Sequence, residues 1–296
     1  MSERTAREPA VLVTGASKGI GTACALQLVR DGFRVYAGVR REEDGRALIT
    51  QGGDGIVPIL IDVTDADQIA AVAARIGEET GERGLHGIVN NAGVAIAGPL
   101  EYLPVEALRR QIEINFTGQI AVTQALLPLL RRCRDWAEGA HRGGRIVFMS
   151  SIAGRSALPF MGAYSASKFA LEAAADALRI ELRPFGITVS LVEPGVIATP
   201  IWDTARRAAD DNLRSMPEEG ERYYGRALDA VRRRLDRGVG GLAPEHVATV
   251  VSHALTARRP RVRYLVGRDA RARAALQWLL PDRVSDRIVH EVVKRL

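Results

Sequence analysis

Lysine and cysteine are scarce in this 296-residue sequence, and long apolar runs are absent from it. Cys24 and Cys133 are the only cysteines, and both lie in stretches predicted to be helical, so we expect neither a disulfide framework nor a zinc site. Free thiols fit a reducing compartment, and we predict a cytoplasmic location. No apolar run approaches the roughly 18 residues of a membrane-spanning helix, and the polar residues 1–9 lack the apolar centre of a secretory signal. We therefore expect no transmembrane segment.

Lysine occurs at only three positions, 18, 168 and 294, among 41 Lys and Arg residues in all. An ammonium is a compact charge whose pKa shifts readily, whereas a guanidinium stays protonated. A chain that uses arginine for nearly every cation nevertheless has lysine at position 168. This choice indicates a role that needs a tunable charge.

The formal net charge of +6 is concentrated in the C-terminal third. Residues 205–296 contain 20 Lys and Arg against 12 Asp and Glu, whereas the first 204 residues contain 21 against 23. A basic segment can bind an anionic substrate, a membrane surface or nucleic acid. A solvated surface in an arginine-rich chain is the simpler interpretation, so we expect no nucleic-acid partner.

The N-terminal segment has the pattern of a strand, a glycine-rich turn and a helix. A β-branched run at residues 10–14 is followed by the turn Gly15–Gly21 and by a helical pattern over residues 22–30. Glycines at 15, 19 and 21 would let the backbone approach a diphosphate, whose charge the start of the helix stabilises. The spacing Gly-x-x-x-Gly-x-Gly between a strand and a helix predicts a dinucleotide site.

The end of the second predicted strand, residues 33–39, bears on the choice of dinucleotide. An acidic residue at this point usually binds the adenosine ribose of NAD, whereas an arginine accommodates the 2′-phosphate of NADP. This chain has Arg40 there, and Lys18 in the glycine-rich turn adds a second cation. Both favour NADP(H) over NAD(H). The acidic residues 42–44 keep NAD open as an alternative, although they resemble the start of a helix.

Further strands are predicted at 56–61, 85–89, 145–149, 187–192 and 263–267, with helical patterns between them. This alternation predicts an α/β fold, a Rossmann-type doubly wound parallel sheet of about seven strands in a three-layer sandwich. We expect one domain over residues 1–296, with a substrate loop and a helical extension in about 200–296. Asp62 follows the third strand and would bind the adenine amino group, with Val63 on the ring; the alternative for Asp62 is a turn residue.

Asn115 lies in the interior of a helix predicted from Val105 to about Arg132. Asparagine is a poor residue in mid-helix because its amide competes for backbone hydrogen bonds. Its position among apolar residues therefore needs an explanation. The polar connection 131–144 that follows is longer than such a link requires, and it either extends the helix or forms a surface flap.

Tyr164 and Lys168 stand four residues apart at the start of a predicted helix. Side chains at this spacing lie one above the other on the same face. A neighbouring ammonium favours the phenolate and lowers the pKa of a phenol, so such a tyrosine can give or take a proton at ordinary pH. The fifth strand has Ser150 and Ser151 at its carboxyl end, and the side chains of adjacent strand residues point to opposite faces.

Together these residues resemble the short-chain dehydrogenase/reductase family, most of all its retinol and hydroxysteroid dehydrogenase branch. The resemblance covers about residues 10–200 and includes the 13 residues from Ser151 to Tyr164. The matching segments are Thr14-Gly15-x-x-x-Gly19-Ile20-Gly21, Asn90-Asn91-Ala92-Gly93, Asn115, Ser151, Tyr164-x-x-x-Lys168 and Pro194-Gly195 with Thr199.

The resemblance implies catalytic roles for Asn115, Ser151, Tyr164 and Lys168. Tyr164 would be the general acid in reduction and the base in oxidation, and Lys168 would lower its pKa and hold the nicotinamide ribose. Ser151 would hydrogen-bond the substrate oxygen, and Asn115 would position a water that links Lys168 to solvent. The candidate cofactor-binding residues are Gly15, Ser17, Lys18, Gly19, Ile20, Gly21, Arg40, Asp62, Val63, Asn91, Ala92, Gly93, Tyr164, Lys168, Pro194, Gly195, Val196 and Thr199.

The substrate predicted from the resemblance is a small apolar ketone, aldehyde or alcohol. Six apolar residues would line its pocket, although each could equally belong to the core: Leu158, Phe160, Met161, Ile197, Ile201 and Trp202. A catalytically idle dinucleotide-binding sensor or scaffold is the alternative, and a sugar-nucleotide epimerase is disfavoured by the gap in the first glycine motif. The resemblance also implies a homodimer or homotetramer that pairs through the helices of Asn115 and Tyr164.

Overall fold

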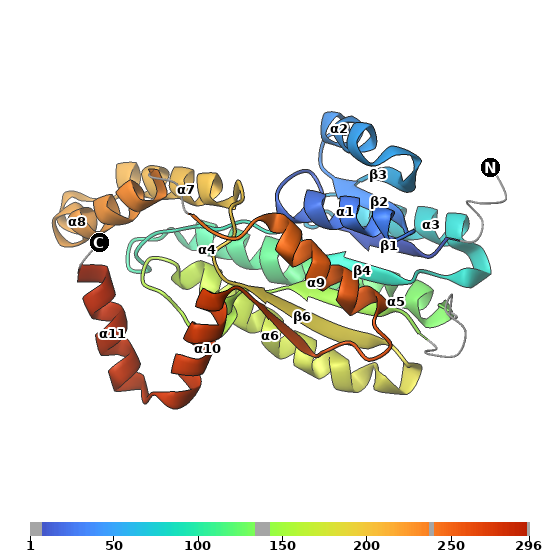
Figure 1. The fold of residues 1–296 in the computed structure, drawn as a ribbon. Coiled ribbons are helices and arrows are strands. Elements are labelled where there is room, and N and C mark those ends of the chain that lie inside the picture. The colour runs from blue at the N-terminus through green and yellow to red at the C-terminus, as the bar shows by residue number, and fades with distance from the viewer. Residues whose placement is uncertain (1–7, 134–142, 237–239, 295–296) are drawn as a thin grey trace.

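The computed structural model describes residues 8–133, 143–236 and 240–294. Its centre is a parallel sheet of seven strands in the order β3-β2-β1-β4-β5-β6-β7 (Figure 1). The strands are β1 (Ala10–Val13), β2 (Arg34–Val39), β3 (Ile56–Leu60), β4 (Gly87–Asn90), β5 (Arg145–Met149), β6 (Thr188–Pro194) and β7 (Arg263–Val266). The predicted Rossmann-type fold is confirmed. The chain adds strands outward from β1 in one direction and then from β4 in the other, and a ligand crevice is expected where the direction changes.

Helices cover both faces of the sheet because successive strand residues point to opposite faces. Val11 and Val13 belong to one hydrophobic core, and Ala10 and Leu12 belong to the other. The first core is closed by α1 (Ile20–Arg30), α2 (Glu42–Gly52) and α9 (Pro244–Thr256), and the second by α3 (Ala66–Thr80), α5 (Gly118–Arg132) and α6 (Gly162–Glu181). Short 3₁₀ turns lie at η1 (Gly53–Gly55), η2 (Gly81–Arg83), η4 (Ile152–Gly154) and η5 (Arg183–Phe185).

The helix predicted from Val105 to about Arg132 is not continuous. α4 (Val105–Ile112) leads into a π-helical segment, η3 (Glu113–Thr117), before α5 begins. Asn115 lies at the centre of this segment, and π-helical turns inside helices are frequent at functional sites. Only the two ends of the predicted 131–144 connection can be assessed, since residues 134–142 lie outside the described part of the chain.

The C-terminal third adds four further helices. They are α7 (Ile201–Ser215), α8 (Glu218–Asp236), α10 (Arg268–Leu279) and α11 (Asp282–Lys294). In Figure 1 they gather at the left end of the molecule, away from the strands β1 to β3. None of the helices in the described residues is long and apolar enough to cross a membrane.

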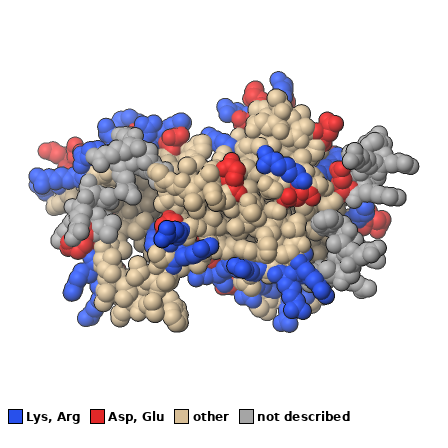
Figure 2. Space-filling view, viewed as in Figure 1, with Lys and Arg blue, Asp and Glu red and all other residues tan. Residues whose placement is uncertain are grey.

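Charged side chains of both signs lie near one another on the face of the molecule drawn in Figure 2. Figure 2 shows Lys and Arg over much of the visible side, with Asp and Glu between them. Part of the basic run in the C-terminal third is also used internally, because Arg263 is ion-paired with Glu172 and Asp176. On the face shown in Figure 2, this distribution fits the interpretation of a solvated surface.

Candidate active site

The candidate residues meet at the carboxyl ends of β1, β4, β5 and β6. The turn after β1 contains two glycines with positive φ, Gly15 at 64° and Gly19 at 61°, a conformation that other residues rarely adopt. A Cβ on Gly21 would lie 2.1 Å from the carbonyl oxygen of Gly15, so only glycine fits there. Ser17 is half-buried and Lys18 exposed in the same turn.

The start of α1 is suited to bind an anion. The helix begins at Ile20, and its N-cap residue, Gly19, provides no side-chain hydrogen bond. The first N–H groups of a helix lack partners within the helix, and its dipole favours negative charge at this end. A tight glycine cradle in front of an uncapped helix therefore fits the diphosphate of a dinucleotide.

Thr14 and Asn91 join the glycine-rich turn to the segment after β4. The Thr14 hydroxyl accepts hydrogen bonds from the N–H groups of Asn91 and Ala92, both at 3.0 Å. The Asn91 side chain donates to the carbonyls of Thr14 and Gly15 at 3.0 and 3.1 Å. Asn91 therefore fixes the shape of the glycine-rich turn.

Arg40 and Asp62 follow neighbouring strands at the adenosine end of the site. Arg40 is exposed. Asp62 Oδ1 accepts from the N–H and hydroxyl of Thr64 at 3.0 and 2.7 Å, which makes Asp62 a turn residue, the alternative that its sequence position left open. Partial burial raises the pKa of Asp62, but the Thr64 hydrogen bonds and the charges of Arg40 and Arg110 outweigh it and lower the pKa. Val63 is buried in the core.

Three buried amides on one helical stripe hold the segment after Ala92. Gln111, Asn115 and Gln119 are each four residues apart, and none is exposed to solvent. Asn115 accepts from Val94 N–H at 2.9 Å and donates to Val94 C=O at 3.0 Å, while Gln111 and Gln119 bind the backbone of Ile96 and Ala92 at 2.8 Å.

This arrangement explains why an asparagine interrupts an apolar helix. Its amide pairs with a loop backbone in place of the helix, and its Nδ2 also donates to Ser167 Oγ at 3.2 Å. The two glutamines were missed by sequence reasoning, although their spacing of four from Asn115 was a readable signal. Gly93 lies against the same amide, since a Cβ there would meet Asn115 Oδ1 at 3.3 Å.

Ser151 and Tyr164 come together from β5 and α6. Burial raises the pKa of the Tyr164 phenol, and a hydrogen bond with the Ser151 hydroxyl acts in the opposite direction. Ser151 Oγ also accepts from Ala153 N–H at 3.1 Å. The neighbouring Ser150 Oγ is buried with no hydrogen-bond partner among the described residues.

Lys168 is buried behind Tyr164 on the same helix. Its Nζ donates to Met149 C=O at 2.6 Å and lies 5.7 Å from the centre of the Tyr164 ring. Burial lowers the pKa of Lys168 to about 8, and the negative charge of Glu172 opposes this shift. The expected lowering of the Tyr164 pKa by Lys168 is not what this arrangement gives, because the ammonium is directed to the backbone and burial of the phenol dominates.

The segment after β6 completes the site. Thr199 lies against the glycine-rich turn, since a Cβ on Gly19 would be 3.2 Å from the Thr199 side chain. Val196 N–H donates to Asp269 Oδ2 at 2.7 Å, and a Cβ on Gly195 would collide with the same carboxylate at 2.1 Å. Asp269 belongs to α10 and had no sequence signal, because its partners are backbone groups more than 70 residues earlier.

α7 and α8 approach the site through polar and aromatic contacts. Asn212 donates to Ala97 C=O at 2.7 Å, and the Tyr224 hydroxyl donates to Glu101 at 2.7 Å. The Tyr224 ring meets Tyr102 and Phe160 edge-on, with centroids 5.9 and 6.3 Å away. Phe160 has φ of 65°, a strained conformation for a residue with a side chain.

Of the residues predicted to line an apolar pocket, Ile197 is instead part of the core. Phe160, Met161, Ile201 and Trp202 are half-buried and Leu158 is exposed. Trp202 Nε1 donates to Ile197 C=O at 2.8 Å, which anchors the start of α7 to the segment after β6.

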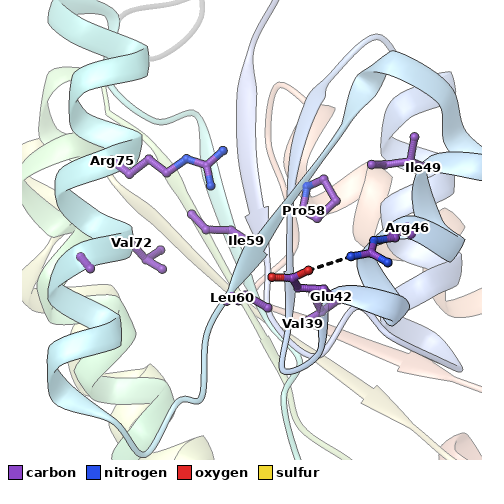
Figure 3. Close-up of a pocket in the computed structure, with 10 residues that line it drawn as sticks. Val39, Glu42, Arg46, Ile49, Pro58, Ile59, Leu60, Val72 and Arg75 are labelled. Atoms are coloured by element: carbon purple, nitrogen blue, oxygen red, sulfur yellow. Dashed lines mark hydrogen bonds and ion pairs between the residues drawn. The ribbon is translucent and has the colours of Figure 1, made fainter.

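A separate groove of about 440 Å³ lies along the outer edge of β3 (Figure 3). Its walls come from α2 and α3, and Arg46 pairs with Glu42 at 2.8 Å within it. Its lining residues are Val39, Glu42, Arg46, Ile49, Pro58, Ile59, Leu60, Ala71, Val72 and Arg75. None of them is among the candidate site residues.

A sequence model of the family "short chain dehydrogenase" matches residues 9–210. The chain belongs to the short-chain dehydrogenase family. It is an oxidoreductase of the class that acts on alcohol and carbonyl groups.

Similar proteins cover nearly the whole chain. Retinol dehydrogenase 5 of Mus musculus is 38% identical over 298 residues, which span 96% of this chain and 89% of the relative. The NADPH-dependent 3-dehydrocapnine reductase of Ornithobacterium rhinotracheale is 34% identical over 290 residues, which span 96% and 97%. A short-chain dehydrogenase/reductase of Burkholderia phymatum, solved in complex with NAD, has a TM-score of 0.75, 25% identity and 94% coverage of each chain.

Proposed function

We propose that this short-chain dehydrogenase interconverts an apolar ketone or aldehyde and the corresponding alcohol, with NADP(H) as the preferred cofactor. Bound NADP(H) supplies or accepts the hydride. In reduction, the Tyr164 phenol gives its proton to the substrate oxygen, and in oxidation the phenolate takes it back. Ser151 donates a hydrogen bond to the same oxygen and so stabilises the negative charge that develops there.

The observation that carries this proposal is that Ser151 and Tyr164 lie close together beside the glycine-rich turn Gly15–Gly21. The Ser151 hydroxyl acts to lower the pKa of the Tyr164 phenol against the effect of burial, and its Oγ donates to Pro194 C=O at 3.4 Å. Thr199 brings the segment after β6 against Gly19, so the hydroxyl pair and the diphosphate cradle lie at the same edge of the sheet. A substrate oxygen bound there would face the two hydroxyls, next to a cofactor bound across this edge.

Three further roles complete the proposal. Lys168 holds the cofactor ribose. Asn115 contributes by fixing the segment of Val94 through two hydrogen bonds, at 2.9 and 3.0 Å. Pro194, Gly195, Val196 and Thr199 seat the nicotinamide carboxamide.

The preference for NADP(H) rests on the cations at the adenosine end. Arg40 and Lys18 are both exposed, where they can reach a 2′-phosphate. Glu42, which would favour NAD, is ion-paired with Arg46 at 2.8 Å. A relative named as NADPH-dependent supports this choice, while a structural neighbour holds NAD, so the preference needs its own measurement.

The substrate class follows from the aromatic contacts of α8. Tyr224 makes edge-to-face contacts with Tyr102 and with Phe160, which lies in the segment that precedes α6. Such a surface favours apolar compounds over charged ones. We further propose one domain over residues 1–296, a homodimer or homotetramer, and residence in the cytoplasm, where the buried thiols of Cys24 and Cys133 remain reduced.

The test is turnover with NADPH and NADH across a panel of steroid, retinoid and medium-chain carbonyls and alcohols. We expect turnover of apolar members of the panel, at a higher rate with NADPH. Ser151→Ala should reduce the rate by about 100-fold or more, whereas Ser150→Ala provides the matched control with near-normal rate. A protein that binds NADPH tightly but turns over no compound would favour the idle sensor or scaffold.

A further inference from the structure

Three ionisable residues follow Tyr164 on α6 at successive spacings of four: Lys168, Glu172 and Asp176. This spacing places them along one stripe of the helix. Lys168 is 4% exposed and Glu172 is 8% exposed. Burying a charge is costly unless it is paired, so the buried acid Glu172 behind Lys168 requires an explanation that the proton transfer at Tyr164 does not supply.

The partners of these acids come from the sheet. Arg263 of β7 lies opposite Leu191 of β6, so its side chain shares a face with that of Glu193, two residues further on. Arg263 Nε donates to Glu172 at 3.1 Å and lies 3.2 Å from Glu193 Oε1, while its Nη2 donates to Asp176 at 2.6 Å. Arg155 Nε lies 2.8 Å from Glu193 Oε2.

The result is a cluster of three acids and three bases with Lys168 at its active-site end. The acids are Glu172, Asp176 and Glu193, and the bases are Lys168, Arg155 and Arg263. Arg179 also pairs with Asp176, so three arginines face the three acids, and it is the negative charge of Glu172 that favours the ammonium form of the lysine.

One further charged residue contacts the cluster, and two on α10 interact with backbone groups outside it. Arg179 binds the outer side of Asp176 at 3.1 Å. On α10, Asp269 accepts from Val196 N–H and Arg273 donates to Ser156 C=O at 2.7 Å. Among these charged groups, Glu172 is the one that opposes the effect of burial on the Lys168 pKa.

We propose that Glu172 and Glu193 are positioning residues of the reaction, which with Arg155 and Arg263 hold Lys168 in its ammonium form behind Tyr164. The inference rests on the proposed proton transfer at Tyr164. Glu193 immediately precedes Pro194 and Gly195, so the same carboxylate also ties the cluster to the segment that seats the nicotinamide end of the cofactor.

Glu193 makes the charge of this cluster depend on pH near neutrality. Burial and repulsion by Glu172 raise its pKa to about 7, although Arg155 and Arg263 act in the opposite direction. Above that pH Glu193 is anionic and supports the Lys168 ammonium; below it the cluster loses one negative charge.

The same shift has a defined effect on folding. The folded protein binds more protons at Glu193 than the unfolded chain between pH 4.5 and about 7. The free energy of unfolding therefore falls as the pH rises through this window, and Glu193→Gln removes that dependence.

The test compares pH profiles of kcat and KM for the reduction reaction in Glu172→Gln, Glu193→Gln and wild type. Glu172→Gln should move the alkaline limb of kcat to lower pH by about one unit, because Lys168 loses the charge that keeps it protonated. Glu193→Gln should remove an inflection near pH 7. Glu181→Gln, an exposed position at the end of the same helix, should retain the wild-type profile. Unchanged profiles in both buried variants would overturn the inference.

Two further variants keep the test decisive. Arg155→Gln, at a half-exposed position, should move the inflection of Glu193 to higher pH even where a buried glutamine variant fails to fold. Tyr164→Phe separates the two proposals. If it remains active, the proposed function fails; if it is inactive while the profiles of the Gln and Arg155 variants match wild type, only the role of the cluster fails.

Discussion

The carboxyl edge of the sheet and the C-terminal helices are built on different principles. At the sheet edge, buried polar groups hold each segment: Asn91 fixes the glycine-rich turn, and Asn115 fixes the segment of Val94. The helices α7, α8 and α10 reach this region through isolated contacts, such as Asn212 to Ala97 and Asp269 to Val196. Buried hydrogen bonds with no alternative partner define one geometry, whereas separate surface contacts permit variation.

The two regions also differ in how far their apolar side chains are exposed. Trp278 is 85% exposed and Leu279 is 64% exposed, both on α10. The core strands, by contrast, expose almost nothing: Leu12, Ile88 and Ile146 are fully buried. Under the proposed function, the chemistry would take place in the part of the chain whose geometry is fixed, and the C-terminal helices would adapt the enzyme to a substrate.

Replacing one glycine in each region should give the largest difference in NADPH affinity and stability between two variants. Gly21→Ala places a methyl group against the Gly15 carbonyl, so we expect a loss of NADPH affinity of more than about 100-fold and a destabilisation of about 1–3 kcal/mol. In α8 the nearest atom to a Cβ on Gly225 is 3.4 Å away, and Gly225→Ala should stabilise the helix by about 0.5–1 kcal/mol. Titration with NADPH and chemical unfolding measure both effects, and equal NADPH affinity in the two variants would contradict the comparison.

A second prediction concerns the choice between NADPH and NADH, where we expect a smaller change in affinity than for Gly21→Ala. The double variant Arg40→Asp, Lys18→Ala should weaken NADPH binding by about 10–100-fold, because two cations that would contact the 2′-phosphate are lost. NADH affinity should change by less than about threefold. Arg46→Ala, which breaks only the pair with Glu42, is the control. A similar loss of both cofactors in the double variant would show that these cations do not recognise the phosphate.

Sequence reasoning predicted the fixed region well for a physical reason. Strands such as Arg145–Met149 and the turn Gly15–Gly21 are determined by local patterns: a β-branched run, and glycines where a side chain would collide. The helix that carries Asn115 was expected to be continuous, and its π-helical interruption depends on pairing with Val94, which is 21 residues away.

The remaining contacts could not be read in advance because they join distant segments. Asp269 and Val196 are 73 residues apart, and Tyr224 and Glu101 are 123 residues apart. Nothing local marks these side chains as partners. The expected effect of Lys168 on the Tyr164 pKa failed similarly, since spacing along a helix does not reveal that the ammonium binds Met149 C=O.

The most direct measurement removes one tyrosine hydroxyl from each region. Tyr164→Phe should lower kcat by about 1,000-fold with NADPH affinity within about twofold of wild type, because the proton donor is lost and the cradle is intact. Tyr224→Phe removes only the hydrogen bond to Glu101 and should change kcat by less than about threefold, with any larger effect confined to KM. A Tyr164→Phe enzyme with wild-type kcat, or an equal loss of kcat in Tyr224→Phe, would contradict the placement of the chemistry at the sheet edge.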